Sequence, residues 1–188
     1  MANQSDNGEV TLVDENDNVI GVLDVLAAHR GAGKLHRAIS VYLFRVHDGT
    51  LELLIQQRSA HKIVGAEQWA NTVCGNVWPN ESYEACAFRR LRDELNITNV
   101  TLTPIYKFRY QVRCNAEFSE NEIDQVFFGW CDDVVQPNSA QAQDYRWVDW
   151  AEMVAQGRGG ESELDLAPWF VIMLNDDALL AQLAQVTP

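Results

Sequence analysis

The sequence predicts a single α+β domain in which a mixed β-sheet is layered with helices. Seven short runs of apolar or alternating residues are bounded by turn residues, which is the pattern of strands. Three longer segments have helical periodicity and are separate from these runs. The 188 residues are 47% hydrophobic, which is enough for one sizeable core and leaves no length for two.

The predicted strands begin soon after a polar N-terminal segment. Residues 1–8 are expected to be a disordered tail, which leaves residues 9–188 as the one domain. Asp17-Asn18 and Asp48-Gly49 are dipeptides typical of hairpin turns, so the first four strands are expected to form antiparallel pairs. The predicted strands are 9–13, 18–23, 38–46, 51–57, 104–112, 121–131 and 143–148.

The predicted helices are 81–95, about 149–156, and 166–184 with a break near Asn175-Asp176. For the first helix, Asn80 is a candidate N-cap. Its apolar arc includes Ala85 and Leu91, and the opposite arc carries Arg90 and Glu94. From this pattern alone, the charged arc is expected to be a solvated, salt-bridged surface.

Composition excludes several classes of function. The net charge of −13 argues against nucleic acid as a partner, because binding to phosphate backbones needs clustered Lys and Arg. No stretch reaches the ~20 apolar residues of a membrane span, and the N-terminus lacks the basic and apolar regions of a signal peptide. The cysteines are too scattered for a zinc ribbon or a redox pair, so reduced thiols and a cytoplasmic location are expected; they are Cys74, Cys86, Cys114 and Cys131.

The helix at 81–95 belongs to a longer motif. Gly75, then Glu81, then the run 89–95 resembles the Nudix box, which implies a Nudix fold with an α/β/α layered sheet and makes this segment its Nudix helix. The box normally places a metal-binding Glu where this chain has Arg90, although Glu94 is retained. A hydrolase of this family needs clustered carboxylates to hold Mg²⁺ and activate water, and an Arg there works against it.

Other segments resemble type I isopentenyl-diphosphate isomerase, a Nudix member of isoprenoid biosynthesis, in the family's order from about residue 9 to 180. The resemblance implies a metal-dependent isomerase that interconverts isopentenyl and dimethylallyl diphosphate. Its small-molecule partner would be an isoprenoid diphosphate. The segments are Ala27-Ala28-His29 with His36, Arg58 with Lys62, Trp69 to Asn76, Phe108-Arg109-Tyr110, Glu120-Asn121-Glu122 and Pro168-Trp169.

This reaction needs two proton-transfer groups on opposite faces of an alkene. The resemblance assigns these roles to Cys74 and Glu122, with Tyr110 bonded to the carboxylate and the π face of Trp169 beside a developing cation. Each residue also has a structural reading. A lone Cys is commonly a buried small hydrophobe, and an aromatic in an apolar helical run is commonly core.

The same resemblance implies a metal site. Glu120 and Glu122 are two apart in a strand, so their carboxylates project from one face, and His29 and His36 complete four of five expected ligands. The fifth, a His in the family, is Asn76 here. Either its amide oxygen binds the ion, which favours Mg²⁺ or Mn²⁺ over Zn²⁺, or the site is vestigial. The alternative for the acids is an edge strand with solvated carboxylates.

Binding of the diphosphate is expected to use Arg58, Lys62 and Arg90, together with a Mg²⁺ ion held by Glu94 and the Cys74 carbonyl. A Lys that the family places at position 25 is Val25 in this chain. For Arg58 and Lys62, ordinary surface charge is the alternative. Two other functions remain open: a Nudix hydrolase of a nucleoside or prenyl diphosphate, and a catalytically silent diphosphate-binding protein.

Overall fold

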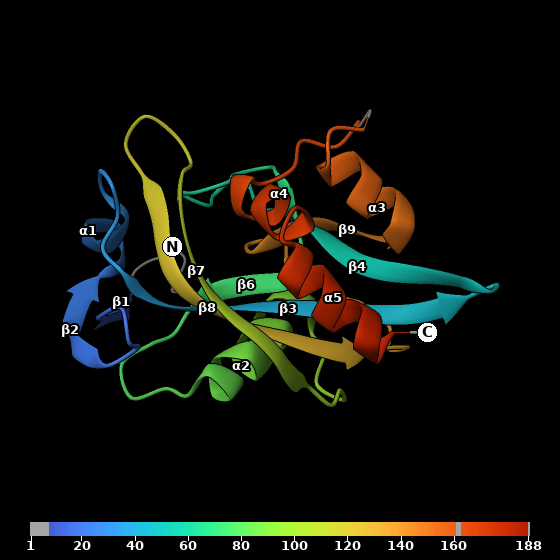
Figure 1. Ribbon diagram of the computed structural model, residues 1–188, viewed down its shortest axis with the longest axis horizontal. Coiled ribbons are helices and arrows are strands. Elements are labelled where there is room, and N and C mark those ends of the chain that lie inside the picture. Colours follow the sequence, from blue (N-terminus) through green and yellow to red (C-terminus); the bar gives the residue numbers. More distant parts are fainter. Residues whose placement is uncertain (1–7, 161–162, 188) are drawn as a thin grey trace.

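The computed structural model describes residues 8–160 and 163–187 (Figure 1). Most of the predicted tail, residues 1–7, lies outside this range. The elements, in chain order, are β1 (Glu9–Val13), β2 (Val19–Asp24), α1 (Val25–His29), β3 (His36–His47), β4 (Thr50–Arg58), β5 (Trp69–Ala70), β6 (Val73–Asn76), α2 (Tyr83–Leu95), β7 (Thr103–Arg113), β8 (Ser119–Trp130), β9 (Ala142–Asp149), α3 (Trp150–Gly157), α4 (Pro168–Leu174) and α5 (Asp177–Val186).

All seven predicted strands and all three predicted helical segments are confirmed, the last as the separate helices α4 and α5. Both predicted hairpins are antiparallel pairs, β1 with β2 and β3 with β4. Asp17 and Asp48 have left-handed backbones, with φ of 63° and 49°, which suits the turn residues that the sequence indicated. The short elements α1, β5 and β6 were not predicted, because five or fewer residues carry too little periodicity.

Strand β3 is the centre of the mixed sheet. It pairs in parallel with β8, and antiparallel with β4 and β6. Alternate residues of β3 face two different cores. Tyr42 and Phe44 pack with the cluster that contains Phe170 of α4, whereas Val41 and Leu43 pack with the cluster of α2. Figure 1 accordingly shows α2 on one face of the sheet and α3, α4 and α5 on the other, the predicted three layers.

Helix α2 begins later than predicted. Its N-cap is Ser82, whose side-chain oxygen accepts a hydrogen bond from the Ala85 N–H at 3.1 Å. Asn80 instead has a left-handed backbone with φ of 64° in the preceding turn. Asn suits both positions, so the sequence alone did not separate a cap from a turn.

The expected faces of α2 are also wrong in part. Ala85 is exposed, whereas the side chains of Arg90 and Glu94 are only 8% and 1% exposed and form an ion pair. These two members of the charged arc are therefore buried against β6, whereas Asp93 on the same arc is exposed as expected. Gly75 in β6 makes room for Arg90, since a Cβ there would lie 2.6 Å from Arg90 Nε.

Within the described residues, no helix has the length and apolar character to cross a membrane.

Candidate active site

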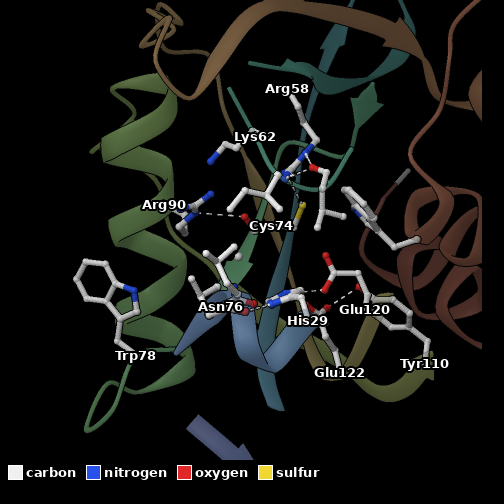
Figure 2. Close-up of a pocket in the computed structure, with 16 residues that line it drawn as sticks. His29, Arg58, Lys62, Cys74, Asn76, Trp78, Arg90, Tyr110, Glu120 and Glu122 are labelled. Atoms are coloured by element: carbon white, nitrogen blue, oxygen red, sulfur yellow. Dashed lines mark hydrogen bonds and ion pairs between the residues drawn. The ribbon is translucent and has the colours of Figure 1, made fainter. Parts of the chain in front are cut away.

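A pocket brings the predicted site residues together (Figure 2). Ten of the twelve line it, and the remaining two, His36 and Glu94, contact residues that do. The lining residues come from α1, β4 and the loop after it, β6 and the loop after it, α2, β7, β8 and α4, so the fold collects them from most of the chain. The lining set of ten is His29, Arg58, Lys62, Cys74, Asn76, Arg90, Tyr110, Glu120, Glu122 and Trp169.

Two adjacent parallel strands position the His and Glu side chains. His36 begins β3 and is directly opposite Glu122 of β8, which places both side chains on one face. His29 ends α1, and the turn that follows passes beside the segment before β8, where Arg30 forms a bridge with Phe118, before β3 begins. Gly33 in this turn has φ of 74° and lies so close to β8 that a Cβ would be 3.0 Å from the Ser119 carbonyl oxygen.

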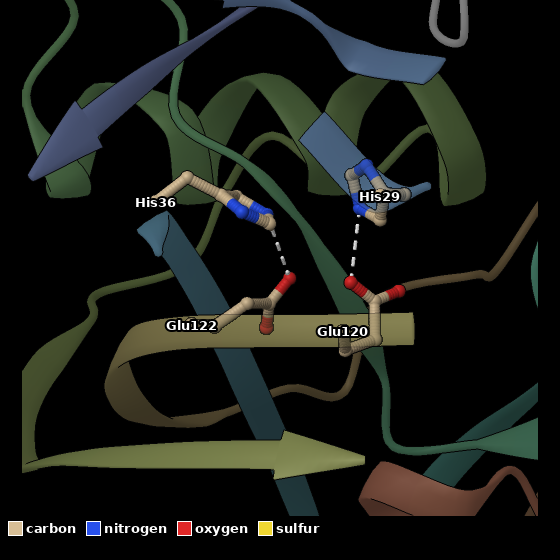
Figure 3. A group of neighbouring side chains, drawn as sticks. All are labelled: His29, His36, Glu120 and Glu122. Carbon is tan, nitrogen blue, oxygen red and sulfur yellow. Dashed lines mark ion pairs between the residues drawn. The ribbon is translucent and has the colours of Figure 1, made fainter. Parts of the chain in front are cut away.

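The four side chains form a compact buried cluster (Figure 3). One potential ligand atom from each of His29, His36, Glu120 and Glu122 lies within 4.8 Å of the others. His29 Nε2 is 2.9 Å from Glu120 Oε2, and His36 Nε2 is 3.4 Å from Glu122 Oε1. The alternative of solvated acids on an edge strand is wrong, since β8 lies between β3 and β7 and both carboxylates are buried.

The ring orientations suit a metal ion. His29 Nδ1 is 2.6 Å from the Val25 carbonyl oxygen, and His36 Nδ1 is 2.7 Å from that of Lys34. A carbonyl only accepts, so each Nδ1 carries a proton and each Nε2 turns a lone pair toward the carboxylates when the ring is neutral. Glu120 Oε2 is buried and accepts no hydrogen bond from the described residues. A divalent cation among these acceptors would satisfy all of them.

Without that cation, protons must balance the cluster. Burial alone would raise the pKa of Glu120, but the His29 and His36 rings lower it to about 2. Burial alone would lower the pKa of His29, but Glu120 raises it to about 9. Burial and the neighbouring Glu120 charge raise the pKa of Glu122. The two carboxyls therefore differ in proton affinity, as two groups with different roles require.

Asn76 also reaches this cluster. Its Oδ1 lies 3.1 Å from His36 Nε2, and the pairing of Asn76 with Ala38 fixes its backbone beside β3. The Asn76 carbonyl oxygen accepts a hydrogen bond from Arg89 Nη2 at 3.1 Å. The side-chain oxygen consequently points at the same centre as the two imidazoles.

Cys74 and Glu122 both face the pocket. Burial raises the pKa of the half-buried Cys74 thiol to about 12, so the thiol form dominates near neutral pH. The Tyr110 hydroxyl donates a hydrogen bond to Glu122 Oε2 at 2.5 Å. Trp169 is 2% exposed, and its ring centroid lies 4.9 Å from the Arg58 guanidinium carbon.

The basic residues form the other part of the pocket. Arg58 donates to the Val64 carbonyl oxygen through Nε and Nη2, and Lys62 donates to Gln141 Oε1. Arg58 and Lys62 are 9% and 5% exposed, so the alternative of ordinary surface charge is wrong. In Figure 2, Lys62 and Arg90 lie together on one side of Cys74, and Arg58 lies above it.

Sequence reasoning missed part of the pocket wall. The pocket is also lined by Leu26, Ile63, Val64 and Trp78. Val25 lines it too, with an apolar side chain where the family has a Lys. Trp78 precedes the cap of α2, where the Arg89 guanidinium carbon lies 3.6 Å from its ring centroid. No local pattern marked these residues, because single apolar residues in loops or in a helix of one turn are ordinary in any sequence.

A family model described as the NUDIX domain matches residues 34–170. The chain is 43% identical over 143 residues to isopentenyl-diphosphate Delta-isomerase 1 of Aromatoleum aromaticum, covering 76% of this chain and 78% of that one. It is 35% identical over 169 residues to the isopentenyl-diphosphate Delta-isomerase of Citrobacter koseri, covering 89% and 91%. The chain belongs to the isopentenyl-diphosphate isomerase family of NUDIX proteins.

Solved structures confirm the NUDIX fold. Protein DR0079 of Deinococcus radiodurans superposes with a TM-score of 0.69 at 21% identity, covering 89% of this chain and 97% of that one. The NUDIX domain of Shewanella oneidensis NrtR superposes with a TM-score of 0.59 at 18% identity, covering 81% and 86%. At these identities the likeness concerns the fold alone.

Proposed function

We propose that the protein is an isopentenyl-diphosphate isomerase, which interconverts isopentenyl and dimethylallyl diphosphate. The identity of the substrate is inferred from the family match. The observation that supports the reaction type is geometric: the Cys74 thiol and the Glu122 carboxyl both line one pocket, and the Tyr110 hydroxyl donates a hydrogen bond to that carboxyl. Two such groups are what a proton addition and a proton removal on one substrate require.

In the proposed binding mode, the diphosphate lies among Arg58, Lys62 and Arg90. Guanidinium and ammonium groups make charge-assisted hydrogen bonds to phosphate oxygens, and burial strengthens them by excluding water. The hydrocarbon then extends toward Cys74 and the ring of Trp169, which leaves the alkene between the two proton-transfer groups. An aromatic face can stabilise a desolvated cation by ~2 kcal/mol, which supports the role proposed for Trp169.

The proposed reaction moves two protons. One group of the pair Cys74 and Glu122 gives a proton to the terminal carbon of the alkene, and positive charge develops on the tertiary carbon. The other removes a proton from the neighbouring methylene carbon, the one between the tertiary carbon and the carbon that bears the diphosphate. The electron pair of that C–H bond becomes the new double bond. The reverse reaction exchanges the two roles. Tyr110 holds the Glu122 carboxyl in place through its 2.5 Å hydrogen bond.

A divalent metal fits the cluster described above. Its proposed ligands are His29, His36, Asn76, Glu120 and Glu122. When bound, the ion supplies positive charge that stabilises the carboxylate form of both acids. Mg²⁺ and Mn²⁺ remain the proposed ions, because an amide oxygen and two carboxylates give the site more oxygen than nitrogen donors.

The test is proton exchange. The metal-loaded protein is incubated with isopentenyl diphosphate in D₂O, and NMR follows deuterium into the methyl groups of dimethylallyl diphosphate. Wild type should form labelled product and Cys74→Ala should not. The matched control is Cys114→Ala, another half-buried cysteine that lies outside the pocket lining, and it should keep activity.

Two other outcomes of the same experiment would reject the isomerase. Release of phosphate or pyrophosphate would indicate the Nudix hydrolase. An intact substrate that nevertheless binds would indicate a silent binding protein. The proposal also retains residues 9–188 as one domain and the cytoplasm as the location.

A further inference from the structure

The Lys62 ammonium group is held by a residue from a distant part of the chain. Gln141 Oε1 accepts a hydrogen bond from Lys62 Nζ, and both side chains are buried. Gln141 lies 79 positions after Lys62, in the turn just before β9. Lys62 lines the pocket and Gln141 does not, so an effect of Gln141 on a bound ligand should pass through Lys62.

The turn that carries Gln141 is fixed to the C-terminal end of α2. The Asn138 N–H donates to the Glu94 carbonyl oxygen at 2.8 Å, and Asn138 Nδ2 donates to the Asp93 carbonyl oxygen at 3.0 Å. The Gln141 N–H donates in turn to the Asn138 carbonyl oxygen at 2.8 Å. The position of Gln141 is therefore set by the same helix that carries Arg90.

The backbone of Gln141 also holds the loop after β4. The Ser59 N–H donates to the Gln141 carbonyl oxygen at 3.0 Å, and the Lys62 N–H donates to the Ser59 carbonyl oxygen at 3.0 Å. Gln141 thus contacts this loop twice, through its carbonyl and through its side chain. The result is visible in Figure 2, where Lys62 and Arg90 lie on the same side of Cys74.

The residue type at position 141 suits this task. A buried ammonium group needs a hydrogen-bond acceptor, and the Gln141 amide oxygen supplies one. The amide is neutral, so it adds no negative charge that would compete with an anion for Lys62. A carboxylate of the same size would form an ion pair with Lys62 instead. Lysine also has a flexible stem, and holding it in place beforehand removes the cost of ordering it when a ligand binds.

We propose that Gln141 is a positioning residue for the anion site: it holds the Lys62 ammonium beside Arg90, and its neutral amide leaves the positive charge of Lys62 to the diphosphate. This role rests on the proposed function, because it assumes a diphosphate ligand in this pocket. Its consequence is that Gln141 contributes to the affinity for diphosphate and not to the proton transfers.

The test measures the affinity for inorganic pyrophosphate. Isothermal titration calorimetry follows its binding to the Mg²⁺-loaded protein, and the isomerase assay gives kcat and KM. Gln141→Met keeps the length of the side chain and removes the acceptor, so pyrophosphate binding should weaken about five- to tenfold. KM should rise by a similar factor and kcat should stay within about twofold of wild type, because the diphosphate takes no part in the proton transfers.

A second variant separates charge from packing. Gln141→Glu keeps the size of the side chain, but its carboxylate pairs with Lys62 and repels the incoming anion, so binding should weaken about tenfold or more. The matched control is Gln143→Met, an exposed glutamine of β9, which should bind pyrophosphate as wild type does. The Tm of each variant shows that it is folded.

A double variant shows whether Gln141 acts through Lys62. Lys62→Met removes the ammonium group, and adding Gln141→Met to it should then leave the affinity unchanged. The proposed role is wrong if folded Gln141→Met binds pyrophosphate as wild type does, or if it weakens binding equally with and without Lys62. Wild type that binds pyrophosphate but forms no product in D₂O would reject the isomerase and leave the role of Gln141 intact, whereas wild type that binds no pyrophosphate would reject both.

Discussion

Two buried acidic centres lie at the pocket, and their negative charge is balanced in different ways. Glu120 and Glu122 face two imidazoles whose outer nitrogens are already bonded to backbone carbonyls, so the cluster is arranged for an added cation. Glu94 has its cation built in, because Arg90 lies one helical turn before it. Both centres are almost fully buried, so burial does not separate them.

The difference lies in where each centre gets its positive charge. A site that must hold an ion permanently presents converging lone pairs, with neutral residues such as Asn76 to complete the shell. A buried carboxylate that has a cationic side chain beside it is neutralised without an added ion, as Arg90 does for Glu94. The two centres thus differ in the source of their positive charge, and the following changes test that contrast.

The largest effect is expected at the first centre. Glu122→Gln removes the proposed proton-transfer group while keeping a side chain of the same size, so the isomerisation rate should fall by about 10³- to 10⁴-fold. The NMR assay measures the rate, and Mn²⁺ titration confirms that an ion is still bound. Glu117→Gln, an exposed glutamate paired with Arg30, is the matched control and should leave the rate unchanged. An active Glu122→Gln variant would remove this residue from the proposed mechanism.

The second centre should respond in stability. Arg90→Gln leaves the buried Glu94 carboxylate without its cation, which should lower the free energy of unfolding by about 3–5 kcal/mol without metal. Urea unfolding at neutral pH measures the loss. Adding Glu94→Gln should restore most of the stability, because the uncompensated charge is then gone. Equal losses in the single and double variants would mean that packing, and not charge, determines the effect.

Much of this molecule was predictable from its sequence, and the exceptions have physical causes. Strands β3 and β8 were marked by apolar or alternating runs, and the family motif indicated the site residues. The burial of Arg90 was not predictable, since the spacing of charges on α2 is the same for a solvated face as for a buried ion pair. Only the neighbouring Gly75, read together with the helix, indicates that the face is approached closely.

The role of Asn76 was similarly ambiguous. Its sequence position allowed either an oxygen ligand or a lost site, and spacing does not separate these. The structure brings Oδ1 to 3.1 Å from His36 Nε2, which supports the first reading. The decisive contact joins residues 40 positions apart, and it depends on the register between β6 and β3.

Replacing Asn76 tests, through the metal preference of the His/Glu cluster, whether residue 76 binds the ion there. Asn76→His adds a third imidazole, which suits Zn²⁺ better than Mn²⁺, so the ratio of Zn²⁺ to Mn²⁺ affinity should rise about tenfold, or ~1.4 kcal/mol. Competition titration with a chromophoric chelator measures both affinities. Asn76→Asp keeps an oxygen donor and should strengthen binding of both ions with less change in the ratio. An unchanged ratio in Asn76→His would mean that residue 76 is not a ligand of the metal ion.

The smallest effect concerns the other ion pair on the same helix. Arg89 bonds Glu81 at 2.6 and 2.8 Å, and although burial alone would raise the pKa of Glu81, Arg89 and the Trp78 N–H lower it below the ordinary value of 4.5. The folded pKa is depressed, so this pair stabilises the fold above about pH 4.5 and loses its contribution as the pH falls through the folded value. The Glu81 side chain keeps 12% of its surface exposed, against 1% for Glu94, and contact with water limits the effect to about 1 kcal/mol. Urea unfolding between pH 7 and pH 3 should therefore show that Glu81→Gln loses slightly less of its free energy of unfolding on acidification than wild type does.

At pH 7, Arg89→Gln should cost far less stability than Arg90→Gln, because the Glu81 carboxylate can be hydrated when its partner is removed and the Glu94 carboxylate cannot.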